Sequence, residues 1–259
     1  IFININLIEK REKLGNTEVL LLHGLFEHKG RHKINADWFD NLGMKSHLID
    51  LPGHGASSKK KGDIDSWEDN DNAVINGFKN IQSAGKKILF GHSYGGLIAT
   101  NAVLKEIVKP DYLILTAPLF EDNYPKFIRN LSGPLAKIAP NLRSFSPVTK
   151  KNISTDKSVG EDYFKDPLVF RSLTFRLGYA ITQVQDFVNE NVGNLNIPTI
   201  VLHGKEDTIV PISGCKNISK LENVTFVEIN NSKHEILNQD TRPFVLSEIH
   251  QWLRENKII

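Results

Sequence analysis

The sequence Lys86–Gly96, KKILFGHSYGG, joins a short apolar run to a serine that is flanked by glycines. An apolar run that enters G-x-S-x-G and continues into a helical segment is typical of a nucleophile elbow, a sharp strand-turn-helix connection. Such a turn strains the serine backbone and brings strand and helix close together, which favours residues without a Cβ at Gly91 and Gly95. We therefore interpret Ser93 as a nucleophile. Because the pattern is short, a glycine-rich turn with an incidental serine is the alternative.

Two later residues follow Ser93 in the order that a serine nucleophile in this setting requires. A serine hydroxyl attacks only when a neighbouring base takes its proton, and the base needs an acid that orients it. The chain order associated with the elbow is serine, then aspartate or glutamate, then histidine. Asp207 follows an apolar strand expected at 199–202, and His234 follows one expected at 225–229. Since reacting groups gather beyond the carboxyl ends of parallel strands, we predict Asp207 as the acid and His234 as the base.

Alternative residues for both roles lie close by in the sequence. Glu206 is adjacent to the predicted acid, and we expect its side chain to face elsewhere. His92 lies inside the elbow and is expected to point into packing, whereas His203 ends a strand and is expected to be a hydrogen-bonded turn residue. We place His250 on the surface of the last helix. The pair named above is therefore preferred.

Acyl transfer also needs two backbone N–H groups that face the negative charge developing on the carbonyl oxygen. One is supplied by the residue after the nucleophile, here Tyr94, and the other by a loop after an early strand. The tripeptide His23-Gly24-Leu25 follows the apolar strand expected at 18–22, so the Leu25 N–H is our candidate. A simple tight turn at His23-Gly24 is the alternative.

Strands and helices alternate along most of the chain. Continuous apolar runs are typical of strands buried on both faces, and apolar residues at every third or fourth position indicate helices. Their alternation predicts an α/β fold with a mostly parallel central sheet flanked by helices. We expect strands at 1–8 (an edge strand), 18–22, 46–50, 88–90, 112–115, 199–202 and 225–229, and helices at 33–43, 65–83, 94–108, 211–221 and 241–255.

The alternation is interrupted between residues 119 and 186. Five prolines divide this stretch into short helical pieces, and it lacks the pattern of a buried strand. Because so long a segment outside the sheet is unusual, we interpret it as a helical cap over the strand ends. The predicted division is a core of residues 1–118 and 187–259 and a cap insertion of residues 119–186. The ten basic residues of the cap outnumber its acidic ones, which indicates either a solvated face or a transient contact with an anionic membrane surface.

Composition limits the classes of partner. The chain has 259 residues and a net charge of +2, which suits one large core and gives no electrostatic argument for nucleic acid. Its single cysteine, Cys215, fits a reducing, cytoplasmic compartment, and we interpret it as structural. No uninterrupted apolar run reaches the roughly 18 residues that a membrane-spanning helix needs. Neither a His/Cys cluster with metal spacing nor a glycine-rich phosphate loop is present, so we predict no metal and no cofactor.

Short motifs occur in a fixed order along nearly the whole chain. They are His23-Gly24 with Glu27-His28 and Gly30-Arg31, Asp50 with Gly53-His54-Gly55 and Ser57, Gly91–Gly96, Asp166-Pro167-Leu168 through Arg171, His203-Gly204 with Asp207, and His234-Glu235 with Leu237-Asn238. Each is weak alone, but the ordered set resembles the monoacylglycerol lipase (lysophospholipase-like) branch of the α/β-hydrolase superfamily.

The resemblance implies a helical cap that forms an apolar acyl tunnel, with monoacylglycerols or similar single-chain lipid esters as substrates. The site residues that it implies are Ser93, Asp207 and His234 as a catalytic triad and Leu25 and Tyr94 as oxyanion donors. One departure is Phe26, which stands where the branch usually has glycine in HG-x-G-EH. A bulky ring at this place would narrow the acyl channel or shift the oxyanion loop.

We therefore expect a carboxylic ester hydrolase that works through an acyl-enzyme. A broad short-chain carboxylesterase would need the same residues, and a ligand-binding protein on the same fold is an alternative of a different class. A peptidase would need acidic cap residues to hold a substrate amine, which the basic cap disfavours. An epoxide or haloalkane hydrolase would need aspartate in place of Ser93.

Overall fold

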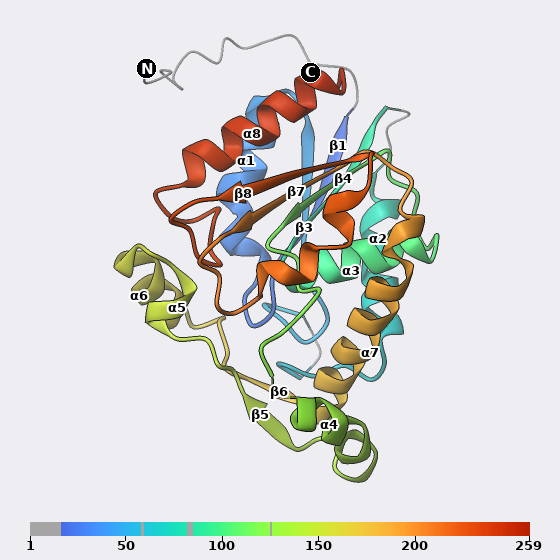
Figure 1. The fold of residues 1–259 in the computed structure, drawn as a ribbon, viewed down its shortest axis with the longest axis vertical. Coiled ribbons are helices and arrows are strands. Elements are labelled where there is room, and N and C mark those ends of the chain that lie inside the picture. Colours follow the sequence, from blue (N-terminus) through green and yellow to red (C-terminus); the bar gives the residue numbers. More distant parts are fainter. Residues whose placement is uncertain (1–16, 58–59, 82–84, 125) are drawn as a thin grey trace.

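A computed structural model describes residues 17–57, 60–81, 85–124 and 126–259 of the chain. A central sheet lies between two layers of helices, and an insertion extends beyond the carboxyl ends of its strands (Figure 1). The edge strand expected at residues 1–8 lies outside the described residues. The predicted α/β fold class is confirmed.

The central sheet has six strands in the order β2-β1-β3-β4-β7-β8, and each neighbouring pair is parallel. Parallel strands all end at the same edge of a sheet, so the loops that follow them gather on one rim. The bounds of the strands are β1 Glu18–Leu22, β2 Lys45–Ile49, β3 Lys87–His92, β4 Tyr112–Thr116, β7 Thr199–Gly204 and β8 Val224–Ile229.

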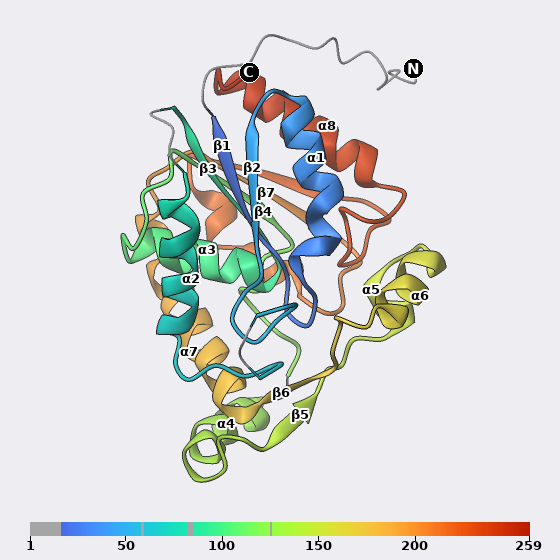
Figure 2. The same cartoon turned by 180° about the vertical axis from the view of Figure 1, so that it is seen from behind.

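Alternate residues of β1 belong to two separate cores, because successive side chains of a strand point to opposite faces. Leu20 and Leu22 pack in the core beneath α2, α3 and α7, whereas Val19 and Leu21 pack in the core beneath α1 and α8. Figure 2 shows the same two helical layers from behind. The bounds of these helices are α1 Lys33–Asn41, α2 Glu68–Lys79, α3 Tyr94–Leu104, α7 Phe175–Asn191 and α8 Arg242–Glu255.

Three predicted helices differ from the structure. Helix α2 begins at Glu68 rather than at residue 65 and ends at Lys79 rather than at residue 83. The helix expected at 211–221 is replaced by two 3₁₀ turns, Ile212–Cys215 and Ile218–Lys220, in a stretch where Gly214, Asn217 and two serines have low helix propensity. Helix α3 ends at Leu104 rather than near residue 108. Two further 3₁₀ turns are Lys29–His32 and Val192–Asn194.

The segment between β4 and α7 contains three helices, where helical pieces were predicted, and a pair of short strands that the sequence pattern did not reveal. Its elements are α4 Lys126–Ile138, β5 Arg143–Phe145, α5 Lys150–Ile153, α6 Lys157–Lys165 and β6 Ser172–Thr174. Strands β5 and β6 pair antiparallel apart from the main sheet. Because α7 runs through the expected border at residue 186 and contacts both α3 and α4, the division into core and cap stays a prediction.

Backbone hydrogen bonds and ion pairs fasten this insertion to the loops beyond β1 and β2. A backbone bond to the loop after β1 places the insertion directly against the candidate oxyanion loop. The two backbone hydrogen bonds run from the Phe170 N–H to Phe26 O (3.1 Å) and from the Thr174 N–H to Gly62 O (2.9 Å). The two ion pairs join Arg176 to Asp63 (2.7 Å) and His28 to Asp166 (2.8 Å).

The turn between β3 and α3 has the geometry expected of an elbow. Ser93 takes φ 51° and ψ −114°, a conformation that side chains rarely adopt. A Cβ on Gly91 would lie 2.5 Å from the Gly95 carbonyl oxygen, and one on Gly95 would collide with the backbone of Leu22 and His23. The two glycines are therefore what lets α3 begin directly against β1 and β3.

Replacing Gly91 with alanine should destabilise the protein by about 3 kcal/mol or more, because the added methyl overlaps rigid backbone. Gly193 provides the matched control, since a Cβ there meets nothing within 4 Å. Gly193→Ala should be neutral or stabilise by up to about 1 kcal/mol. Urea unfolding of both variants measures the difference, and similar unfolding midpoints would contradict the close approach described here.

Candidate active site

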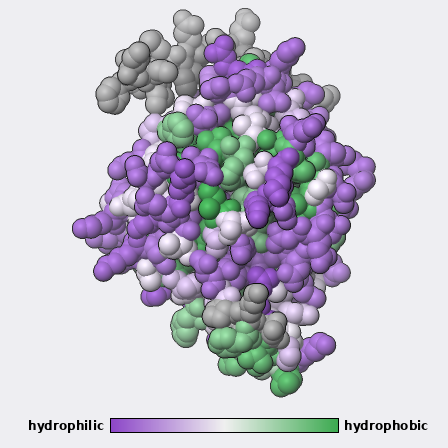
Figure 3. Space-filling model, viewed as in Figure 1, coloured by the Kyte–Doolittle hydropathy of each residue, from purple (hydrophilic) through white to green (hydrophobic). Residues whose placement is uncertain are grey.

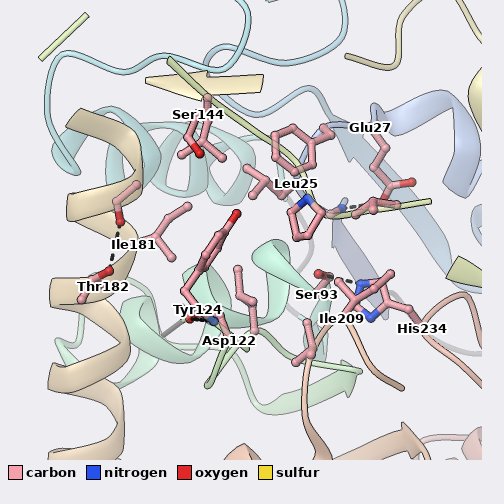
Figure 4. A pocket seen from close by; sticks show the side chains of 18 of the residues that line it. Leu25, Glu27, Ser93, Asp122, Tyr124, Ser144, Ile181, Thr182, Ile209 and His234 are labelled. Atoms are coloured by element: carbon pink, nitrogen blue, oxygen red, sulfur yellow. Dashed lines mark hydrogen bonds between the residues drawn. The ribbon is translucent and has the colours of Figure 1, made fainter. Parts of the chain in front are cut away.

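The structure brings Ser93, Asp207 and His234 together at the rim formed by the strand ends. Ser93 follows β3, Asp207 follows β7 and His234 follows β8. The distance from Ser93 Oγ to His234 Nε2 is 2.9 Å, and that from His234 Nδ1 to Asp207 Oδ2 is 2.7 Å. Figure 4 shows the contact between the hydroxyl and the imidazole. The three side chains thus form one hydrogen-bonded chain.

The carboxylate of Asp207 is held rigidly by its own loop. Its Oδ1 accepts the N–H groups of Ile209 and Val210, each at 2.9 Å, whereas Oδ2 lies 2.7 Å from His234 Nδ1 and 3.4 Å from His203 Nε2. Burial opposes the charge of Asp207, but the neighbouring histidines hold the pKa of this carboxyl well below its usual range. Burial alone would lower the pKa of His234, but the charge of Asp207 and the hydrogen bond to it raise that pKa above its usual value.

One of the other candidate side chains, His203, also lies beside Asp207, with its Nε2 3.4 Å from Oδ2. Glu206 is exposed, although it is next to Asp207 in sequence. The imidazole of His92 contacts Thr116 through Nδ1, and His203 donates from Nε2 to the Val210 carbonyl at 3.0 Å. His250 is only partly buried on α8. Within the described residues, no group of three or more His, Cys, Asp or Glu side chains is arranged to hold a metal ion.

The two candidate oxyanion residues lie next to Ser93: Leu25 lines the same cavity, and Tyr94 follows Ser93 directly in the chain. Neither of their backbone N–H groups has a hydrogen-bond acceptor within the part of the chain that the structure describes. Tyr94 begins α3, so its N–H lies at the positive end of a helix. The Tyr94 ring is buried in the core, where its hydroxyl accepts a hydrogen bond from Asn70 at 2.8 Å. The side chain is therefore used in packing, and only the backbone N–H of Tyr94 is a candidate oxyanion donor.

Phe26 has an unusual conformation beside the candidate oxyanion loop. Its φ of 72° lies in the left-handed region that favours glycine, the residue usual at this place in the resembling branch. The ring is buried and meets the ring of Phe170 edge-on, with 5.4 Å between centroids. Phe26 also lines the cavity described next, so it restricts the space near Leu25.

A cavity of about 340 Å³ opens in front of Ser93. Figure 4 shows its walls, which come from the loops of the sheet on one side and from the insertion and α7 on the other. Most of the lining is apolar, with the pair Asp122 and Arg129 as a polar exception. Apolar lining residues from different elements include Leu119, Leu135, Val148, Ile153, Ile181 and Ile209.

A buried charged cluster lies at the end of the cavity near His234, and the sequence patterns did not reveal it. Arg31 pairs with Glu27 at 2.7 Å and with Glu235 at 2.8 Å, and its guanidinium lies 4.7 Å from the centroid of the Tyr163 ring. Burial opposes the charge on both acids, but the charge of Arg31 helps keep the pKa of each below its usual value. All three residues belong to quoted motifs, but Glu235 is 204 residues from Arg31 in sequence, so the motifs did not reveal that they pair.

No helix among the described residues is both long enough and apolar enough to cross a bilayer.

Cys215 is buried and forms no disulfide, and its Sγ lies 3.5 Å from His203 Nδ1. These two residues form a small internal contact next to Asp207.

Comparisons with known proteins place this geometry in a family. Residues 16–241 match the family described as serine aminopeptidase, S33. A monoacylglycerol lipase of Mycolicibacterium smegmatis is 24% identical over 247 residues, which cover 91% of this chain and 87% of that protein. The crystal structure of Paleococcus ferrophilus monoacylglycerol lipase superposes with a TM-score of 0.84 at 26% identity, covering 91% of this chain and 93% of that one.

A soluble variant of the Saccharomyces cerevisiae monoglyceride lipase, solved with a substrate analogue, has the same fold with a TM-score of 0.84 at 22% identity. That match covers 95% of this chain and 89% of the yeast chain. The resemblance to the monoacylglycerol lipase branch, inferred from the ordered motifs, is thereby confirmed. The chain belongs to the S33 family of α/β-hydrolases.

Proposed function

We propose that this protein is a serine hydrolase that cleaves monoacylglycerols or similar single-chain carboxylic esters through an acyl-enzyme. The observation that carries the proposal is the hydrogen bond of 2.9 Å between Ser93 Oγ and His234 Nε2 at the wall of an apolar cavity. A hydroxyl, a base and a space for an acyl chain are the minimum that this reaction needs. The lipase names of the relatives support the choice of substrate.

The reaction follows from the positions of these groups. His234 Nε2 takes the proton of Ser93 as Oγ attacks the ester carbonyl, and the N–H groups of Leu25 and Tyr94 stabilise the oxyanion. His234 then gives the proton to the departing alcohol, and water repeats the sequence to release the fatty acid. Asp207 keeps the imidazole in the required tautomer and stabilises its charged form.

Two other activities are compatible with the same hydrogen-bonded chain. A short-chain carboxylesterase would prefer small acyl groups, whereas the cavity volume of about 340 Å³ and its apolar lining favour a long one. A peptidase, the activity in the family description, would need an acid for the substrate amine. Glu27 and Glu235 line the cavity, but both already accept hydrogen bonds from Arg31, which favours the ester. A ligand-binding protein would bind the ester without turnover.

Replacing Ser93 with alanine should lower kcat for a monoacylglycerol by a factor on the order of 10⁶, because the nucleophile is lost. Thermal unfolding should stay close to that of the wild type. A ladder of p-nitrophenyl esters from two to sixteen carbons, with amino acid p-nitroanilides beside it, measures activity and preference. Retention of most ester turnover in the variant would refute the assignment of Ser93, and turnover confined to anilides would favour the peptidase.

The pH dependence should follow the ionisation of His234, which must be neutral to accept the serine proton. Because Asp207 raises the pKa of His234, kcat/KM should rise with pH to a plateau with a midpoint above 6.5. Asp207→Asn removes that charge, so the midpoint should move to lower pH and kcat should fall by about 10⁴. The exposed Glu206 is the control, and a larger loss in Glu206→Gln would overturn the choice of acid.

The proposal includes a transient contact between the insertion and a membrane surface, at a peripheral cytoplasmic location. Apolar side chains gather at the lower end of the molecule, over α4 and β5 (Figure 3). Among them, Phe127 is 63% exposed, Ile138 84% and Phe145 79%. Exposed apolar groups of this size favour a lipid surface. Such a contact would bring the cavity near membrane-dissolved substrate.

Introducing a charge at this surface should weaken binding to lipid. Ile138→Asp should reduce cosedimentation with mixed phosphatidylcholine and phosphatidylglycerol vesicles by roughly tenfold, because an apolar anchor is lost. Phe244, 49% exposed on α8, gives the control variant Phe244→Asp, which should bind like the wild type. Equal binding of all three proteins would contradict the placement of the contact on α4.

A further inference from the structure

The imidazole of His23 is buried where β1 ends, between the backbones of Gly24 and Leu51. The Leu51 N–H donates to His23 Nε2 at 3.0 Å, and His23 Nδ1 lies 2.8 Å from the Gly24 carbonyl oxygen. An N–H group only donates and a carbonyl only accepts, so the ring proton must be on Nδ1. Burial lowers the pKa of His23 to about 4, which keeps the ring neutral at the pH where the reaction runs.

The Gly24–Leu25 peptide is the group that this hydrogen bond holds. In a planar trans peptide the C=O and the N–H point in opposite directions. Fixing the Gly24 carbonyl against His23 therefore fixes the direction of the Leu25 N–H on the other side. Leu25 lines the cavity, and a Cβ on Gly24 would lie 3.3 Å from Ser93 Cβ, so this segment borders the nucleophile.

The preceding peptide is held as well. The Gly24 N–H donates to Glu27 Oε1 at 2.5 Å, and the same oxygen accepts a hydrogen bond from His32 Nε2 at 2.9 Å. Between the two held groups lies a glycine, which has no side chain to resist rotation of its backbone. Without the bond from His23, the Gly24–Leu25 peptide would be free to rotate and turn its N–H away from Ser93.

We propose that His23 is a positioning residue for the oxyanion hole: by holding the Gly24 carbonyl from Nδ1, it aims the Leu25 N–H at the oxyanion that forms on the substrate. This role rests on the proposed function, because it needs an acyl transfer at Ser93. His23 does not touch the substrate. It acts only through the orientation of one peptide.

Two substitutions separate the two hydrogen bonds of the ring. The amide nitrogen of asparagine is as many bonds from Cα as Nδ1 is, so His23→Asn keeps a donor for the Gly24 carbonyl and loses the acceptor for Leu51. The amide oxygen of glutamine corresponds in the same way to Nε2, so His23→Gln keeps the acceptor for Leu51 and loses the donor. Each variant thus removes one buried hydrogen bond, which makes them controls for each other.

For a monoacylglycerol, His23→Gln should lower kcat by about 100-fold with little change in KM, because a misdirected oxyanion donor costs transition-state stabilisation alone. His23→Asn should retain kcat within about fivefold of the wild type. An acyl trifluoromethyl ketone, whose hemiketal oxygen occupies the oxyanion position, should bind the Gln variant more weakly by the same factor as the loss in kcat. Active-site titration refers each rate to folded protein, and thermal unfolding reports the loss of stability in each variant.

A purely structural role predicts a different pattern. Equal losses in the two variants, a loss confined to KM, or unchanged inhibition by the ketone would overturn the positioning role. Nitrogen-15 NMR of the wild-type imidazole gives a measurement that needs no variant: a proton on Nε2, or a charged ring at neutral pH, would overturn it too. If the wild type has no Ser93-dependent ester turnover, the proposed function fails; turnover with equal variants removes only the role of His23.

Discussion

The close approach of α3 to β1 and β3 is the constraint on which the site depends. Gly91 and Gly95 allow that approach, and the turn between them presents Ser93 at the rim of the sheet. Because the neighbouring strands are parallel, the loops after β1, β7 and β8 reach the same rim. The order of the strands thus brings together the Ser93 hydroxyl, the His234 imidazole and the candidate oxyanion loop, although the three are far apart in sequence.

Charge is buried around the nucleophile, and each charge has partners. Asp207 has two backbone donors besides His234, and Arg31 joins Glu27 to Glu235. Buried charges cost several kcal/mol each unless they are paired and hydrogen-bonded. In this protein the pairs also join the core to the insertion, because Arg31 lies over Tyr163 of α6. The charged groups near Ser93 are therefore stabilised by partners within the protein rather than by water.

The sequence allowed the sheet and the trio of Ser93, Asp207 and His234 to be predicted because both depend on local signals, namely apolar runs and the residues directly after them. It did not predict β5 and β6, since three-residue strands carry too little pattern to distinguish them from loop. The pair Arg31–Glu235 and the hydrogen bond between Leu51 and His23 depend on tertiary structure alone. The helix expected at 211–221 was wrong because apolar spacing was given more weight than the low helix propensity of Gly214, Asn217 and the two serines of this stretch.

The hydrogen bond from the Phe170 N–H to the Phe26 carbonyl joins the insertion to the backbone beside the candidate oxyanion loop. Phe26 follows Leu25 directly, so the insertion and the oxyanion loop share one backbone contact. If that part of the insertion swings outward to admit a bulky ester, the bond either breaks or drags the neighbouring peptide with it. Any displacement of Phe170 is therefore coupled mechanically to the backbone that carries the Leu25 N–H.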